Sequence, residues 1–227
     1  MLLRGEQDVQ KRKRNHYSSA HDLALLAQAV IRDFPEYYRW DSQKEFTYNN
    51  ITQKNRNLLL WRDESVDGLK TGYTEDAGYC MVASAKRDDM RLISVVMGTA
   101  SPNARANESQ SLLNYGFRFF ETHKLYEAGK VLTEARVRKG ETSMLPVGVA
   151  EDVYVTVPRK HFNELKAETQ VDKAIIAPIK KGDTLGSLNV TLAGEVILTK
   201  PLVAMDNIAE GGFFRRLYDA VLVLLER

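Results

Sequence analysis

In the first 125 residues, two segments place their apolar residues three and four positions apart, which is the spacing of an amphipathic helix. The first covers residues 18–34, where a serine at the start can cap the helix. Its capping candidates are Ser18 and Ser19, and its apolar stripe is Leu23, Leu26, Ala27, Val30 and Ile31. The second covers residues 101–123, where Ser101 can cap the helix and Pro102 suits its first position. We therefore expect two helices with residues 35–100 between them.

Residues between these helices alternate with the period of two that is typical of β-strands. Residues 44–53 form two short runs around Asn49-Asn50, a pair that suits a hairpin turn. Residues 55–61 predict an extended connector. Three longer runs follow, at residues 68–74, 78–87 and 91–99. Their close spacing favours an antiparallel meander.

The helical period fades beyond residue 125, and short alternating runs separated by turns take its place. The turn signals are Lys181-Gly182-Asp183, Ala193-Gly194 and Pro201. This pattern predicts a small all-β domain over residues 126–209. We expect an α+β chain in four parts: an unassigned basic segment 1–16, a sheet-and-helix domain 17–125, the β-rich domain, and a terminal helix 210–227.

The last part, residues 210–227, regains the helical period. Its apolar side holds Phe213, Phe214, Leu217, Tyr218, Val221, Leu224 and Leu225. Arg215, Arg216, Asp219 and Glu226 avoid that side. The pattern fits a helix that lies in the interface of an anionic membrane, and it equally fits a helix docked on its own domain.

Composition excludes several classes of function. The 227 residues are 44% hydrophobic and 27% charged, with a formal net charge of +2, as in an ordinary soluble globular chain. The basic run Lys11–Arg14 has no interleaved aromatic residues, so we interpret it as a solvated segment and expect no nucleic-acid partner.

Metal, disulfide and targeting signals are also missing from the sequence. The single cysteine, Cys80, cannot form an internal disulfide, and its apolar neighbours favour a buried hydrophobe over a nucleophile. The four histidines are dispersed without the spacing of a zinc site. We therefore expect no metal site. No stretch is long enough for a signal peptide or a membrane-spanning helix, so we also expect no export of the chain as printed.

Lys70-Thr71-Gly72 is the candidate that carries chemistry. It lies in a predicted strand, and such a tripeptide alone is weak because it occurs by chance. Serine acyltransferases of the penicillin-binding and β-lactamase classes combine S-x-x-K, S-x-N and K-T-G, with the last on an edge strand. There a lysine supplies positive field, a threonine hydroxyl holds a carboxylate, and a glycine lets the substrate backbone approach.

Five separated segments resemble the low-molecular-mass penicillin-binding proteins, which are serine-type D-alanyl-D-alanine carboxypeptidases. They are "YSSAHDLALLAQAVIRDFPEYY", "KEFTYNNITQKNRNLLLW", "VDGLKTGYTEDAGYCMVASA", "MRLISVVMG" and "LLNYGFRFFETH". The resemblance extends over about residues 17–227. It implies the C-terminal part of a transpeptidase/β-lactamase-like domain, followed by the β-rich domain and an amphipathic anchor helix.

The resemblance also implies a function and a site. Family members act at the periplasmic face of the bacterial inner membrane, need no cofactor, remove the terminal D-alanine from peptidoglycan pentapeptides, and are trapped by β-lactams. Its K-T-G motif falls on Lys70, Thr71 and Gly72, and its carboxylate-binding arginines fall on Arg56 and Arg105. The membrane contact would use Phe213, Phe214, Leu217, Val221 and Leu225.

The chain departs from the family pattern in two ways. Tyr73 stands where the family commonly has histidine, and no S-x-x-K occurs anywhere. Two S-x-N strings, at residues 101–103 and 187–189, follow the K-T-G instead of preceding it, so we interpret both as accidental.

These departures lead us to expect a truncated product that is inactive by itself. Two alternatives stay open: a non-catalytic peptidoglycan-binding or membrane-associated module, and a β-lactamase. The β-rich domain and terminal helix argue against the β-lactamase.

Overall fold

A computed structural model describes residues 17–212 of the chain. The basic run Lys11–Arg14 and the apolar side of the predicted terminal helix lie outside these residues. The fold is α+β, as predicted, and forms two compact units that divide between Phe119 and Phe120. The sequence expectation placed this division after residue 125. Each unit is described separately.

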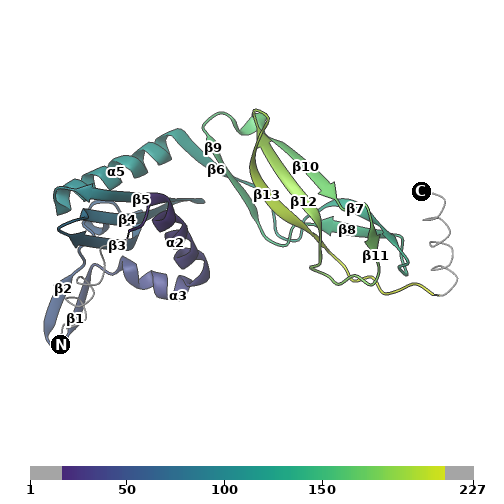
Figure 1. Ribbon diagram of the computed structural model, residues 1–227, viewed down its shortest axis with the longest axis horizontal. Helices are drawn as coiled ribbons and strands as arrows, with labels where there is room; N and C mark the ends of the chain where they lie inside the picture. Colours follow the sequence, from purple (N-terminus) through teal and green to yellow (C-terminus); the bar gives the residue numbers. More distant parts are fainter. Residues whose placement is uncertain (1–16, 213–227) are drawn as a thin grey trace. The chain divides into compact units, whose positions relative to one another are not determined.

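The first unit centres on a three-stranded antiparallel meander, as predicted. Its elements are α2 (Ala20–Asp33), α3 (Pro35–Tyr38), the 3-10 helix η1 (Arg39–Ser42), β1 (Glu45–Tyr48), β2 (Ile51–Lys54), α4 (Leu59–Arg62), β3 (Val66–Thr74), β4 (Gly78–Arg87), β5 (Met90–Thr99) and α5 (Pro102–Phe119). Five successive buried residues, Met81–Ala85, show that central β4 is covered on both faces. Helices α5 and α2 supply this cover from opposite sides of the sheet, and β3 is left as an edge strand (Figure 1).

Both predicted helix starts are confirmed. The Ser19 hydroxyl accepts from the Asp22 N–H at 3.1 Å, and the Asp22 carboxylate accepts from the Ser19 N–H at 3.2 Å, which forms a capping box. The Ser101 hydroxyl accepts from the Ala104 N–H at 3.0 Å at the start of α5. These bonds satisfy amide donors that have no partner within a helix.

The apolar stripe of α2 is buried less than its pattern suggests. Ala27 is fully buried against the sheet, whereas Leu26 is exposed. Leu23, Leu26, Ala27 and Val30 instead form one wall of an apolar groove of about 390 Å³. The opposite wall includes Leu69, Lys70, Thr71 and Gly72 of β3.

Two local predictions are wrong. The predicted extended connector contains a short helix, α4. Leu59 and Leu60 are adjacent and both buried, whereas adjacent side chains of an extended strand would point to opposite faces. The predicted helix over residues 101–123 ends at Phe119, because the following residues form strand β6 (Phe120–Tyr126) and pair with β9 (Val153–Pro158). A helical period therefore continued for one turn beyond the actual helix end.

The predicted hairpin at Asn49-Asn50 is confirmed. Strands β1 and β2 pair antiparallel from Tyr48↔Ile51 to Glu45↔Lys54. Both asparagines have positive φ, 49° and 61°, which is the conformation that a two-residue turn of this hand requires.

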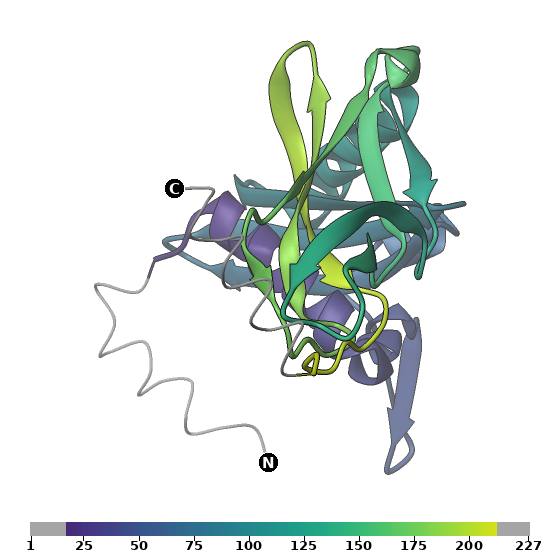
Figure 2. The same cartoon turned by 90° about the vertical axis from the view of Figure 1, so that its right-hand side faces the viewer.

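The second unit is rich in β-strands, as predicted. Besides β6 and β9 it contains β7 (Val131–Arg138), β8 (Met144–Gly148), the 3-10 helix η2 (Phe162–Glu164), β10 (Lys166–Val171), β11 (Ile175–Ile176), β12 (Thr184–Leu192) and β13 (Glu195–Ala204). Six of its strands form one sheet in the order β10-β12-β13-β8-β7-β11. Figure 2 faces this unit and shows the sheet strongly curled around its interior. Leu145, Val147, Leu188, Val190 and Leu202 fill that interior.

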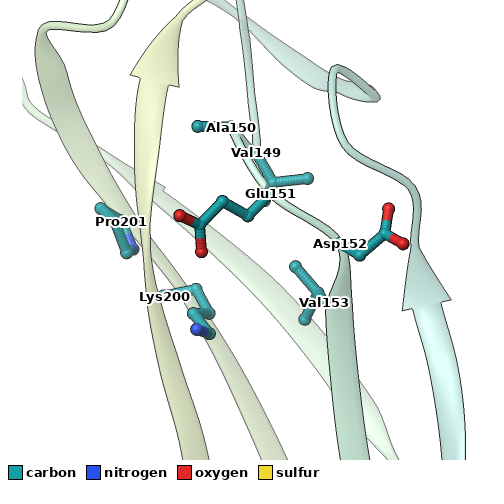
Figure 3. A pocket seen from close by; sticks show the side chains of 7 residues that line it. All are labelled: Val149, Ala150, Glu151, Asp152, Val153, Lys200 and Pro201. Carbon is teal, nitrogen blue, oxygen red and sulfur yellow. The ribbon is translucent and has the colours of Figure 1, made fainter. Parts of the chain in front are cut away.

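A hollow of about 300 Å³ lies in the second unit between β13 and the loop that leads into β9 (Figure 3). Val149 and Val153 form its apolar floor, and Glu151 and Lys200 border it. Asp152 points away and forms an ion pair of 2.9 Å with Lys124. The hollow contains none of the residues that the sequence singles out for chemistry.

Candidate substrate-binding site

Lys70-Thr71-Gly72 lies in the middle of the edge strand β3. Its partner strand β4 places Lys70 opposite Val82, Thr71 opposite Met81 and Gly72 opposite Cys80. The other edge of β3 pairs with no strand among residues 17–212. Its backbone is therefore available to hydrogen-bond an extended peptide.

The two ends of the tripeptide face different surroundings. The Lys70 ammonium folds back and donates to the Thr71 carbonyl at 2.7 Å. It also lies near Asp41, whose pKa is raised by burial against the opposing effect of the Lys70 charge. A Cβ added to Gly72 would meet nothing within 4 Å, so no internal contact requires glycine there. The open space suits close approach of a molecule from outside.

A cavity of about 440 Å³ brings together four of the five residues predicted for the site. Its lining comprises Arg56, Leu58, Thr71, Gly72, Tyr73, Tyr79, Pro102 and Arg105. Lys70, the fifth residue, borders the apolar groove beside α2, and Thr71 and Gly72 line both hollows. The K-T-G strand thus forms a wall between a cationic cavity and an apolar groove.

Arg105 is buried, with only 4% of its surface exposed. Its guanidinium donates to the Gly72 carbonyl at 3.1 Å, the Cys80 carbonyl at 3.4 Å and the Arg56 carbonyl at 3.4 Å. Its Nε has no hydrogen-bond partner among the described residues. Burial lowers the pKa of Arg105 from its ordinary value, although the group stays charged. One arginine therefore joins β3, β4 and the loop before α4 and still brings positive charge to the cavity.

Arg56 has a different environment, because its side chain is exposed. The neighbouring residue Asn57, which is fully buried, fixes the backbone beside Arg56. The Asn57 amide donates to the Gly68 carbonyl of β3 at 2.9 Å and accepts from the Leu59 N–H at 3.0 Å. The loop that carries Arg56 is thereby tied to the strand that carries the K-T-G.

Tyr73, the departure from the family pattern, stacks across the strands on Tyr79, with 4.3 Å between ring centroids. The Arg105 guanidinium lies 5.5 Å from the Tyr79 ring centroid on the cavity side. The tyrosine pair therefore forms an aromatic side to the cavity, where a histidine would have introduced a titrating group.

A polar network around Asp67 of β3, which the sequence analysis did not predict, ties this strand to β5 and α3. Arg91 of β5 donates two bonds of 2.7 Å to the two carboxylate oxygens of Asp67 and one of 2.8 Å to the Ser84 hydroxyl. The Tyr38 hydroxyl donates to Asp67, and burial raises the pKa of Tyr38 above its ordinary value. Nothing local in the sequence shows that two distant residues, Tyr38 and Arg91, converge on Asp67.

Within the first unit, neither S-x-N string supplies a free serine beside the K-T-G. The Ser101 hydroxyl is engaged as the cap of α5, and Ser187 lies on β12 in the other unit. The printed residues therefore provide a cationic cavity with an edge strand but no S-x-x-K.

Comparison with known proteins gives matches for both units. A family model described as "D-alanyl-D-alanine carboxypeptidase" matches residues 10–101, and one described as "Penicillin-binding protein 5, C-terminal domain" matches residues 120–210. D-alanyl-D-alanine carboxypeptidase DacC of Escherichia coli is 46% identical over 209 residues, which cover 91% of this chain and 52% of the relative. DacA of the same organism is 44% identical over 210 residues, which cover 92% and 52%.

A solved structure of penicillin-binding protein 5 from Haemophilus influenzae also matches, with a TM-score of 0.76 and 44% identity. The match covers 87% of this chain and 58% of that one. The chain spans about half the length of the curated relatives it matches. Two successive family models and these relatives agree: the chain belongs to the low-molecular-mass penicillin-binding proteins of the D-alanyl-D-alanine carboxypeptidase family.

Proposed function

We propose that this chain supplies the K-T-G side of a serine-type D-alanyl-D-alanine carboxypeptidase, which trims peptidoglycan pentapeptides and is acylated by β-lactams. The observation that carries the proposal is the cavity in which Arg56, Arg105, Thr71 and Gly72 meet beside an open strand edge. Guanidinium and hydroxyl donors match the free carboxylate that ends a D-alanyl-D-alanine stem.

In the proposed reaction a serine from outside the printed residues attacks the carbonyl carbon between the two D-alanines. The C–N bond breaks, and D-alanine leaves with a proton on its nitrogen. Water then hydrolyses the acyl-serine ester and restores the hydroxyl. β-Lactams would enter the same acylation step through their ring carbonyl.

The residues of this chain would act on the substrate before and during that attack. Arg56 is exposed and fixed by its loop, so it would pair with the terminal carboxylate together with the Thr71 hydroxyl. Arg105 would add positive charge from the cavity floor while holding β3 and β4 together. Lys70 would supply positive field and manage protons, and the substrate backbone would pair with β3 where Gly72 leaves space.

A chimaeric enzyme tests this function. The first half of DacC, joined to residues 17–227 of this chain, would contain one complete motif set. We expect it to release D-alanine from a pentapeptide and to be labelled covalently by a fluorescent penicillin. Lys70→Ala should reduce D-alanine release by several orders of magnitude without unfolding the protein. A folded chimaera that takes no label would contradict the proposal.

We further propose that the terminal residues attach the protein to an anionic membrane surface, at the periplasmic face of the inner membrane. The support is the sequence pattern of Phe213, Phe214, Leu217, Val221 and Leu225, which lie outside the described residues. Within residues 17–212, none of the helices has the length and hydrophobicity needed to cross a bilayer.

A further inference from the structure

Three exposed aromatic side chains follow one another at intervals of three residues after α2. Phe34 is 55% exposed, Tyr37 is 62% exposed and Trp40 is 55% exposed. The rings of Phe34 and Tyr37 have centroids 6.5 Å apart, and those of Tyr37 and Trp40 lie 5.4 Å apart at an interplanar angle of 86°. We call these three residues the aromatic ladder.

The geometry of the aromatic ladder leaves ring faces open. In a perpendicular pair the edge of one ring meets a face of the other, so Tyr37 and Trp40 cover only one ring face between them. Tyr38, one of the two residues between them, is buried. The segment thus places one aromatic side chain in the core and its neighbours in solvent, and a contiguous exposed apolar patch of this kind marks an interaction surface.

The aromatic ladder is fixed to the strand that carries the K-T-G. Tyr38 donates to Asp67 of β3, and its ring fills the space above Gly68. Helix η1, which carries Trp40, packs against β3. The Asn55 amide donates to the Asp41 carbonyl at 3.3 Å and to the Gln43 carbonyl at 3.0 Å. The backbone that carries Tyr37 and Trp40 is therefore anchored before any ligand arrives, which lowers the entropic cost of binding.

We propose that the aromatic ladder binds the glycan strand of peptidoglycan through its N-acetylated sugar rings. Pyranose rings present faces of C–H bonds with a slight positive charge, which stack on the negative face of an aromatic ring. This inference rests on the proposed function, because a stem peptide held along β3 brings its attached glycan to the neighbouring surface. The aromatic ladder would then orient a polymeric substrate, while the Arg56 cavity recognises the end of the stem.

The two tryptophans of the chain make a direct test possible. Trp61 is 42% exposed on α4 and lies outside the aromatic ladder. Trp61→Phe leaves Trp40 as the only tryptophan, and Trp40→Phe leaves Trp61. Each variant of the full chain is titrated with chitotetraose, a β-linked tetramer of N-acetylglucosamine, while tryptophan emission is recorded. We expect a saturable change for the Trp40-only protein and none for the Trp61-only protein.

Further variants separate this site from the carboxylate cavity. Tyr37→Ala in the Trp40-only protein should weaken chitotetraose binding at least fivefold, whereas Arg56→Ala should leave it unchanged, because the sugar has no peptide. Three results would overturn the proposal: no saturable change at Trp40, an equal response to maltotetraose, or sedimentation showing that a second copy of the chain covers Trp40 without sugar. None of these results would affect the recognition of D-alanyl-D-alanine.

Discussion

The ring of Tyr38 occupies the space that a side chain on Gly68 would need. A Cβ built on Gly68 would lie 2.8 Å from two atoms of that ring. Tyr38 cannot move away without losing its bond to Asp67, which Arg91 also holds. One glycine, two residues before Lys70, therefore lets the polar network sit directly beneath the site.

Gly68→Ala should lower the free energy of unfolding by about 1–3 kcal/mol, because the added methyl group overpacks a rigid site. Urea denaturation of the full chain measures this change. Gly72→Ala is the matched control on the same strand, and it should stay within about 0.5 kcal/mol because its Cβ meets nothing within 4 Å. Equal effects of the two substitutions would show that the packing of the Tyr38 ring does not require a glycine at position 68.

At the scale of single residues, the sequence predicted features that depend on nearby residues and missed those that depend on distant ones. The sequence predicted the serine caps and the asparagine turn, because each depends on residues within a few positions. It did not predict the convergence of Tyr38, Asp67 and Arg91, which requires the register of three strands. It also named Arg105 for substrate binding without showing that its guanidinium is largely used by backbone carbonyls.

The start of the second unit is set by the pairing of strand β6 with strand β9. Strand β6 pairs with β9 from Phe120↔Pro158 to Tyr126↔Val153, yet its sequence continues the helical period of α5. The period alone could not locate the end of the helix, because the partner strand lies some thirty residues further along the chain. The sequence predicted the meander correctly, since its three strands follow one another closely. Alternation and turn signals predicted a second unit rich in strands, but they could not show that β13 pairs with β8 or that β7 pairs with β11.

Residues 120–212 expressed alone should therefore unfold cooperatively in urea. A fragment that starts at residue 130 lacks β6, the one strand that pairs with β9 among residues 17–212. We expect it to unfold at lower urea and to expose amides of β9 to hydrogen exchange. Indistinguishable stabilities of the two fragments would mean that β6 is not part of this folding unit.

The predicted terminal helix is tested by its own substitutions. Burial of each large apolar side chain contributes roughly 1.5–3 kcal/mol at full burial, and each arginine adds about 1 kcal/mol near anionic lipid. Leu217→Asp with Val221→Asp should abolish co-sedimentation of the full chain with anionic vesicles. Arg215→Gln with Arg216→Gln should only weaken it and remove its salt dependence. Binding that survives the double aspartate substitution would place the apolar side against protein instead.

At the scale of the whole molecule, two family models follow one another along the chain, and the match covers about half the length of the relatives. The resemblance predicted this membership from five separated segments, which no short motif could have done. Physical reasoning from the sequence could not show that Lys70 borders an apolar groove while Arg56 and Arg105 share a cavity. That arrangement depends on a long-range contact, the bond by which Asn57 ties the loop before α4 to Gly68 of β3. The absent S-x-x-K leads us to expect no D-alanine release from this chain alone.

Recognition of a free terminal carboxylate is the central claim, and it does not require the serine. Calorimetric titration of the full chain compares an N-acylated peptide ending in D-alanyl-D-alanine with the same peptide carrying a C-terminal amide. We expect the acid to bind at least tenfold more tightly, a difference of about 1.4 kcal/mol, because the amide offers no charge to Arg56. Arg56→Ala should abolish this preference, whereas Arg136→Ala, an equal change of charge in the second unit, should preserve it. Equal affinities for acid and amide, or a preference that survives Arg56→Ala, would contradict the account.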